Sequence, residues 1–259
     1  MRNLLLGAAA ALMACALPSL ASAQTGYADV SYSHASVDLG AGDNQDFNAG
    51  AVNGVAAFDL GEAGVQIGAG YANLNPDHGD NVDDWHAEGH VYKRTDNWQL
   101  GGGAAYSHYD GDGANADEWT VGAEALFFAA RTTWGATLSY SDADDADLKE
   151  TALTGEVRHF VSDNFSLGAN VGYGSIDTSG PGGNDDEWSA GVGAEYQFAN
   201  SPISVFGGYE HTDISDEDVK SDAVTIGARW NFGGSLFDRD RSGANLHQLR
   251  GVEEHVFGI

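Results

Sequence analysis

Twelve short stretches of this chain alternate apolar side chains with small or polar ones, and two kinds of connection follow them in turn. One kind is long and rich in aspartate, as in 110–118 and 176–187. The other kind spans three to six residues, as in 95–97 and 59–64. A two-residue period is typical of β-strands, because successive side chains point to opposite faces. The regular change between long and short connections predicts an antiparallel up-and-down sheet whose two ends face different surroundings.

The clearest of these stretches covers residues 188–198. Trp188, Val192 and Tyr196 fall on one face, whereas Gly191 and Glu195 fall on the other. The same pattern predicts strands at 27–38, 47–58, 65–73, 85–94, 98–109, 119–128, 132–141, 151–160, 165–175, 188–198, 202–212 and 222–232. Alternation is interrupted over residues 48–55, so ten or fourteen strands remain open as alternatives to twelve.

The composition of the second face separates a barrel from a soluble β-sandwich. That face carries mostly glycine, serine and asparagine, which suits a confined lumen better than open water, and the chain holds 36 glycines against 4 prolines. Only helices and closed barrels satisfy every backbone group in lipid. The sequence therefore predicts an all-β fold, an antiparallel up-and-down transmembrane β-barrel of about 12 strands over residues 24–232. Aromatic residues near the strand ends are expected to form the girdle at the two membrane interfaces: Trp85, Trp98, Trp119, Trp188, Trp230 and Phe232.

The first 23 residues have the three parts of a secretory signal peptide. Arg2 gives the positive start, residues 4–17 the apolar run, and Ala21-Ser22-Ala23 the small-residue cleavage site. We expect residues 1–23 to be removed, which leaves no cysteine in the mature chain. The segment that ends at Cys15 resembles a lipobox, so lipoprotein processing at Cys15 stays open as an alternative.

Charged residues on the inward-facing positions are the candidate selectivity residues of a channel: Glu88, Glu124, Glu156, Arg158, Glu195 and Arg229. Acids outnumber bases in this set, which favours passage of cations over anions. Many glycines share the inward face, Gly122 and Gly168 among them, and we expect them to leave room for water. Structural ion pairs across the wall are the alternative role of the charged residues.

His86 and His90 flank Glu88 on the same strand face, a spacing that suits a metal ion. Two neighbouring histidines in a wet lumen more often act only as polar lining, so they are weak metal candidates. We expect no cofactor, apart from loosely bound divalent cations at the acidic loops. We also expect no enzyme activity, because His34, His108 and His211 adjoin hydroxyl residues that point to the opposite face. Catalytic pairs across strands remain open.

The signal peptide, the strand alternation, the loop asymmetry and the segment Ala223–Phe232 together resemble a Gram-negative outer-membrane β-barrel, similar to the small porin-like proteins of alphaproteobacteria. The resemblance implies long extracellular loops and two periplasmic termini. It also implies contact with outer-membrane lipid and lipopolysaccharide, and with the assembly machinery that reads the last strand. The formal charge of −28 excludes nucleic acid as a natural partner.

Residues 233–259 depart from that resemblance, because such barrels normally end on the aromatic residue of the last strand. This extension carries Arg239, Arg241 and Arg250, with Leu246 and Leu249 at nearly helical spacing. Two interpretations stay open: a periplasmic extension, or a plug drawn in by acidic lumen residues. The sequence favours a porin-like channel for passive diffusion of small hydrophilic solutes. A non-conducting surface or adhesion protein, whose acidic loops carry the role, is the alternative.

Overall fold

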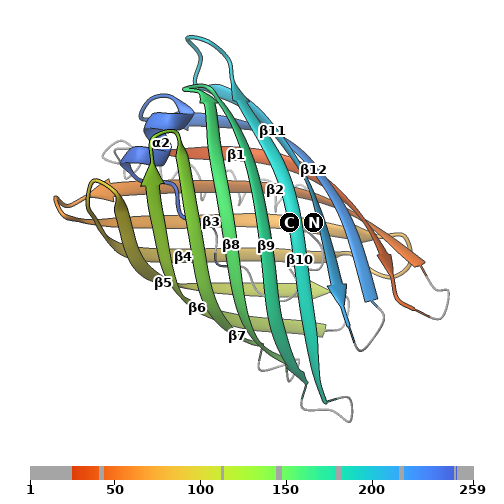
Figure 1. Cartoon of the computed structure of the whole chain (residues 1–259). Helices are drawn as coiled ribbons and strands as arrows, with labels where there is room; N and C mark the ends of the chain where they lie inside the picture. The colour runs from red at the N-terminus through yellow and green to blue at the C-terminus, as the bar shows by residue number, and fades with distance from the viewer. Residues whose placement is uncertain are drawn as a thin grey trace.

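The computed structural model describes residues 25–40, 44–111, 114–143, 148–178, 183–215, 219–247 and 249, which form a closed antiparallel barrel and one short helix (Figure 1). Each strand pairs with its neighbours in the chain, and β1 pairs with β12 to close the barrel. The elements are β1 (Thr25–Asp38), β2 (Asn44–Asp59), β3 (Ala63–Pro76), β4 (Val82–Arg94), β5 (Trp98–Gly111), β6 (Ala114–Ala129), β7 (Thr132–Ala143), β8 (Leu148–Ser162), β9 (Phe165–Thr178), β10 (Gly183–Gln197), β11 (Ile203–Ile214), β12 (Val219–Phe232) and α2 (Leu236–Ser242). The predicted signal peptide, with Cys15, lies outside the described residues.

The predicted fold class is confirmed, and the count of twelve strands excludes ten and fourteen. Strand β2 pairs without interruption despite its irregular pattern, because small residues such as Gly50 and Ala51 fit either face of the wall. Several strands run further toward the long loops than predicted. Strand β6 begins at Ala114, for example, and its Glu118 lies buried on the inner face. The acidic residues there had been assigned to loops, although they continue the strand alternation.

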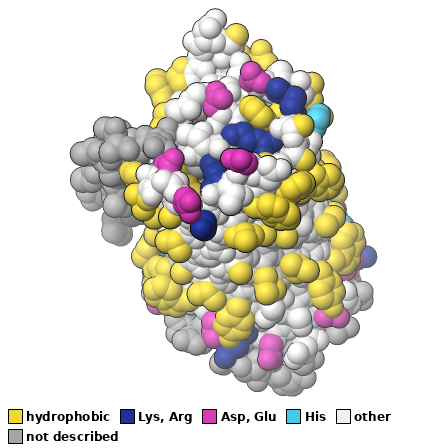
Figure 2. All heavy atoms as spheres, turned by 60° about the vertical axis from the view of Figure 1, so that its left-hand side comes forward, with side chains coloured by type: hydrophobic (Ala, Val, Ile, Leu, Met, Phe, Trp, Pro, Cys, Tyr) yellow, Lys and Arg dark blue, Asp and Glu magenta, His cyan; other side chains and the backbone are white. Residues whose placement is uncertain are grey.

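The two faces of the wall reverse the usual arrangement of a soluble protein. Large apolar side chains stand exposed outside, such as Val171 at 63% and Ile226 at 61% of full exposure. Polar side chains such as Gln66 and Ser204 are completely buried inside. Figure 2 shows hydrophobic side chains spread over the outer wall. A wall of this kind requires apolar surroundings, as a lipid bilayer provides.

Aromatic residues lie near both ends of this outer wall. Trp85, Trp119 and Trp188 are exposed near the long loops, and Trp98 and Trp230 are exposed near the short turns. The sixth girdle candidate, Phe232, is half-buried, with its ring against Gly26. Close to the long loops, tyrosine hydroxyl groups donate hydrogen bonds to aspartates across the hairpins: Tyr71 to Asp83 at 2.6 Å, Tyr106 to Asp117 at 2.7 Å, and Tyr209 to Asp222. These pairs mark where the apolar outer surface changes to a polar one.

We call the two ends of the barrel the short-turn end and the long-loop end. At the short-turn end the chain leaves β12 through Gly233 and Gly234, whose φ angles of 94° and 121° favour glycine. Ser235 then caps α2 through a capping box with Asp238, since each side chain bonds the other's backbone N–H. The chain therefore turns back sharply, and α2 lies at the barrel opening instead of leading away from it (Figure 1).

Candidate functional site

Arg229 is the centre of the first charge network inside the barrel. Its guanidinium lies 2.7 Å from Asp29 on β1 and 2.9 Å from Glu195 on β10. The same guanidinium lies over the rings of Tyr27 and Phe206, at 4.0 and 4.7 Å from their centroids. Arginine suits this position, because its planar group stacks on aromatic rings while it bonds two carboxylates. The network links strands that are distant in the sequence.

A second network is centred on Arg158 of β8. Its Nη2 donates to Glu156 on the same strand at 3.1 Å, and its Nη1 lies 3.0 Å from Asp240 of α2. Arg158 also donates to the backbone oxygen of Asn245 at 2.6 Å. His247 lies 2.7 Å from the other oxygen of Glu156. Residues beyond β12 thus complete a charge cluster of the barrel wall.

The histidine of the third group lies between two glutamates. His90 Nδ1 is 2.9 Å from Glu124, and its Nε2 is 3.2 Å from Glu88. The backbone N–H of Leu249 donates to Glu88 at 3.1 Å. His86 lies 3.8 Å from Asp84. Among the described residues no group of three or more histidine, cysteine or acidic side chains is placed to hold a metal ion.

All six predicted selectivity residues therefore face the lumen, but none stands alone there. Each glutamate has a histidine or arginine partner, and each arginine has two acidic ones. Each of these charges is paired in the wall, with His90 shared between Glu88 and Glu124, and their role in ion selectivity stays a prediction. The alternative of structural ion pairs describes the geometry better.

The described residues after α2 begins lie in the lumen or at its opening, and we call residues 235–247 together with Leu249 the tail segment. Gln66 of β3 and Leu246 exchange two hydrogen bonds, of 3.0 and 3.2 Å. Leu246 also packs with Tyr92, Leu126 and Phe128 in a buried apolar cluster. The tail segment is thus held by hydrogen bonds, ion pairs and apolar contacts together.

Arginines of α2 add further bonds to the wall near the short-turn end. Arg239 lies 2.9 Å from Glu195, and Arg241 donates to the backbone oxygen of Ala130 at 3.0 Å. Burial lowers the pKa of the Arg241 guanidinium, while the neighbouring Asp240 carboxylate opposes that shift. Figure 2 brings this end forward and shows basic and acidic side chains gathered around the opening.

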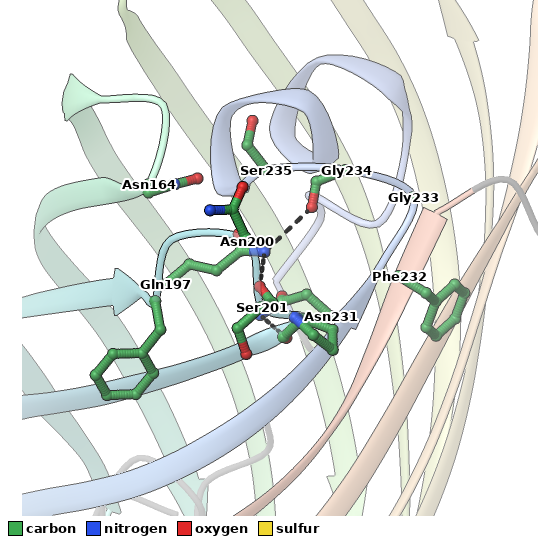
Figure 3. Close-up of a pocket in the computed structure, with 11 residues that line it drawn as sticks. Asn164, Gln197, Asn200, Ser201, Asn231, Phe232, Gly233, Gly234 and Ser235 are labelled. Atoms are coloured by element: carbon green, nitrogen blue, oxygen red, sulfur yellow. Dashed lines mark hydrogen bonds between the residues drawn. The ribbon is translucent and has the colours of Figure 1, made fainter.

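The connection from β12 to α2 is fixed by hydrogen bonds to the wall (Figure 3). Gln197 donates through Nε2 to the backbone oxygens of Ser201 and Gly234, at 2.9 and 3.3 Å. The N–H of Phe237 donates to the backbone oxygen of Asp163 at 3.0 Å. The start of the tail segment is therefore tied to two neighbouring short turns.

Most inward glycines are closely surrounded, on both sides of the barrel. On β3–β7 a Cβ atom would meet neighbouring side chains: Glu88 at 2.5 Å from Gly68, Leu249 at 2.6 Å from Gly122, and Glu156 at 2.4 Å from Gly135. On β9, β10 and β12 it would meet Ser189 at 2.5 Å from Gly172, Asn170 at 2.5 Å from Gly191, and Phe206 at 2.3 Å from Gly227. These glycines accommodate larger residues, so the prediction that the inward glycines leave room for water does not hold for them. At Gly168 on β9 the nearest atoms are 3.8 Å away.

The more open side of the lumen forms a cavity of about 350 Å³. It lies between the tail segment and the wall of β1, β2 and β8–β12. Its lining is mainly polar or small and includes Asn53, Asn170, Gly168, Thr225 and Arg229. The tail segment thus fills part of the lumen, and another part is hollow.

The sequence model of one protein family, the outer membrane protein beta-barrel domain, matches residues 47–232, which is most of the chain. The chain belongs to this family. Its fold and family place it in an outer membrane, as predicted from the sequence. No curated protein matches the chain.

Solved structures share the barrel at low sequence identity. The COG4313 outer membrane channel of Pseudomonas putida F1 has a TM-score of 0.63 and 12% identity, over 81% of this chain and 96% of that one. The translocator domain of the autotransporter NalP of Neisseria meningitidis has a TM-score of 0.53 and 13% identity, over 86% and 96%. The KdgM porin has a TM-score of 0.50 and 12% identity, over 79% and 99%. These likenesses concern the fold.

Sequence reasoning missed several residues of this family member that complete the lumen networks. Asp29 was not selected on β1, and Gln66 and Gln99 were not singled out among polar lining residues, although both bond the tail segment. Asp240 was missed as the partner of Arg158. A usable signal was present, because buried arginines in a strongly acidic barrel require carboxylates, and Asp240 lies between two basic residues of the extension.

Proposed function

We propose that this barrel is an outer-membrane channel for passive diffusion of small hydrophilic solutes. The observation that carries the proposal is the 350 Å³ polar cavity in the lumen, beside the tail segment. A barrel that served only as an anchor has no need for hollow, polar volume inside. The channel and porin among the similar structures are consistent with this function, although their likeness extends only to the fold.

We further propose that cations pass more readily than anions, but with a different origin from the four glutamates predicted to select them. Inward acids line the long-loop half of the lumen, all of them strongly buried in the wall: Asp84, Glu118, Glu150, Asp185 and Glu187. All six described arginines lie near the short-turn end or in the tail segment. An acidic entrance of this kind concentrates cations.

The orientation follows from the same proposal. Outer-membrane barrels carry short periplasmic turns and longer extracellular loops, so the long-loop end faces outward and the tail segment lies on the periplasmic side. Outward aspartates near that end, such as Asp83 and Asp117, adjoin the headgroup region, where divalent cations shared with lipopolysaccharide phosphates would bind loosely. Contact with the outer-membrane assembly machinery belongs to the proposal as well, through the last strand.

We propose no catalytic role. The three histidines near the long-loop end bond amide or acidic side chains on the outer wall: His34 with Asn48 at 3.1 Å, His108 with Asp117 at 2.5 Å, and His211 with Asp222 at 2.9 Å. None of these bonds joins a histidine to a hydroxyl nucleophile, which acyl transfer requires. We assign a structural role in the lumen to His86 and His90, the weak candidates for metal binding.

Planar-bilayer recording of the full mature chain tests the channel function. We expect discrete current steps in salt solution and uptake of small uncharged solutes by liposomes that contain the protein. Heat-unfolded protein at the same concentration is the control. Conductance equal to that of an empty bilayer would rule out the channel.

The alternative is a non-conducting surface protein in which the acidic loops act on partners. The observation that favours it is the tail segment, which occupies part of the lumen. Deletion of individual long loops separates the two functions. Solute passage should persist or increase in a channel, whereas a surface protein would lose its activity and show no passage at any stage.

A further inference from the structure

The tail segment shares the lumen with the cavity. It bonds Gln66 on β3, Thr133 on β7 and Arg158 on β8. Its Arg239 also lies 2.9 Å from Glu195 on β10, and its Ala244 packs against β1 and β2. The cavity occupies the space that is left, against β1, β2 and β8–β12. The cross-section of the barrel is therefore shared between protein and open volume.

From this arrangement we propose that the tail segment is a resident plug that confines solute passage to the cavity side and sets its size limit. The proposal deepens the channel function and rests on it. It assigns the predicted selectivity residues a new role, since Glu88, Glu156, Arg158 and Glu195 anchor the plug.

Complementary charges on α2 and on the barrel wall fix the position of the plug. Arg239 bonds Glu195, while Asp240 bonds Arg158, so adjacent residues of α2 with opposite charges meet opposite charges on the wall. Thr133 donates a further hydrogen bond to Asp240 at 2.6 Å. A shift of α2 by one residue would bring like charges together. The charge pattern thus specifies one position of the helix.

Shape complementarity supports the same assignment beyond α2. A Cβ atom at Gly122 would stand only 2.6 Å from the side chain of Leu249. Leu246 and Leu249 are both buried, at 5% exposure, although they belong to a segment outside the barrel strands. Apolar side chains of a tail that only passed through a wet lumen would remain exposed. The wall is therefore shaped to receive this segment.

A pair of engineered cysteines tests the placement in the full chain. The chain has one cysteine, Cys15, in the predicted signal peptide, so the pair Gly122→Cys with Leu249→Cys is alone in the mature protein. We expect this pair to form a disulfide readily under mild oxidation. The pair Val121→Cys with Leu249→Cys is the matched control, because Val121 points outward at 53% exposure. Equal crosslinking of both pairs, or of neither, would overturn the placement.

The same crosslink serves to measure how the plug affects single-channel conductance. Arg158→Gln removes the bonds to Asp240 and Asn245, and it should increase single-channel conductance by about twofold or more, since conductance follows the open cross-section. In the cysteine-pair background, oxidation should suppress this increase and reductant should restore it. Lys93→Gln removes an equal charge at an exposed pair with Glu62 and should leave conductance unchanged.

The outcomes separate the two proposals. Crosslinking with a reversible effect on conductance supports the plug. Conductance that is unchanged by Arg158→Gln and by oxidation overturns the plug while the channel function stands. Silence of every form, with efficient crosslinking of the inward pair, overturns the channel function instead.

Discussion

The short-turn half and the long-loop half of the lumen use acidic residues differently. In the short-turn half, Glu195 and Glu156 each bond an arginine of the wall, and the tail segment adds further partners. In the long-loop half, buried inward acids such as Asp84 and Asp185 lie in a region whose described lysines and arginines are Lys149 and Lys220, and His86 lies 3.8 Å from Asp84. Both lysines lie close to half-buried aspartates, Lys149 at 3.6 Å from Asp142 and Lys220 at 3.5 Å from Asp213.

This difference teaches that position, more than residue type, decides what an inward glutamate does. Paired charges in a protein interior contribute to structure, and removal of one partner leaves the other buried without compensation. Acidic charges around a channel entrance act on passing ions through their electric field instead. The short-turn half is therefore assigned to holding the tail segment, and the long-loop half to attracting cations.

The largest effect is expected for Arg229→Ala in the short-turn half. The substitution leaves Asp29 and Glu195 without their shared guanidinium and removes its contacts with Tyr27 and Phe206. Loss of one partner of a buried ion pair costs about 3–5 kcal/mol. Urea unfolding in lipid vesicles, followed by tryptophan fluorescence, measures the change. A free energy of unfolding equal to that of the parent would contradict a structural role for this network.

A smaller but distinct effect is expected for Leu246→Asp. A carboxylate beside Tyr92, Leu126 and Phe128 is costly to bury, so the tail segment should leave the lumen while the barrel stays folded. Trypsin should then cut after Arg239 and Arg241 in the folded protein. Ser242→Asp, at an exposed position, is the control and should stay protected. Equal protection of both variants would show that the apolar contacts do not hold the segment.

The long-loop half is tested by Asp84→Asn combined with Asp185→Asn. Loss of two inward acids should move the reversal potential in a salt gradient toward zero, because the entrance attracts fewer cations. Glu124→Gln is the comparison in the other group, since the Glu124 carboxylate lies 2.9 Å from His90, and it should change the potential less. A larger shift for Glu124→Gln would reverse the assignment of the two groups.

The smallest effect on stability is expected for Glu62→Gln, in the short turn between β2 and β3. A hydrogen bond from Lys93, with its positive charge, holds the pKa of Glu62 below its usual value. A depressed pKa stabilises the fold above the unfolded-state pKa, and this contribution disappears as the pH falls through the folded-state value. Because both groups are exposed, water and salt screen the pair. Glu62→Gln should therefore unfold like the parent at neutral and at acidic pH, and a clear loss at neutral pH alone would contradict this.

Sequence reasoning recovered the barrel because the two-residue period is a local property of each strand. Trp188 to Phe198 shows it without knowledge of any other segment. The lumen residues were found for the same reason, since alternation fixes which side chains point inward. The partners of these lumen residues were not found, because a contact such as that between Arg229 and Asp29 forms only when β12 pairs with β1. The place of Leu246 and Leu249 also depends on where the chain turns after β12, which no periodic pattern encodes.

We divide the lumen into a half with paired charges, where the tail segment lies, and an acidic half. The reversal potential of the full mature chain, in a planar bilayer with a salt gradient, tests this division most directly. Small current steps with a potential biased toward cations are the predicted result. Steps without bias, or with a bias toward anions, would contradict the division. No steps at all would contradict the channel itself.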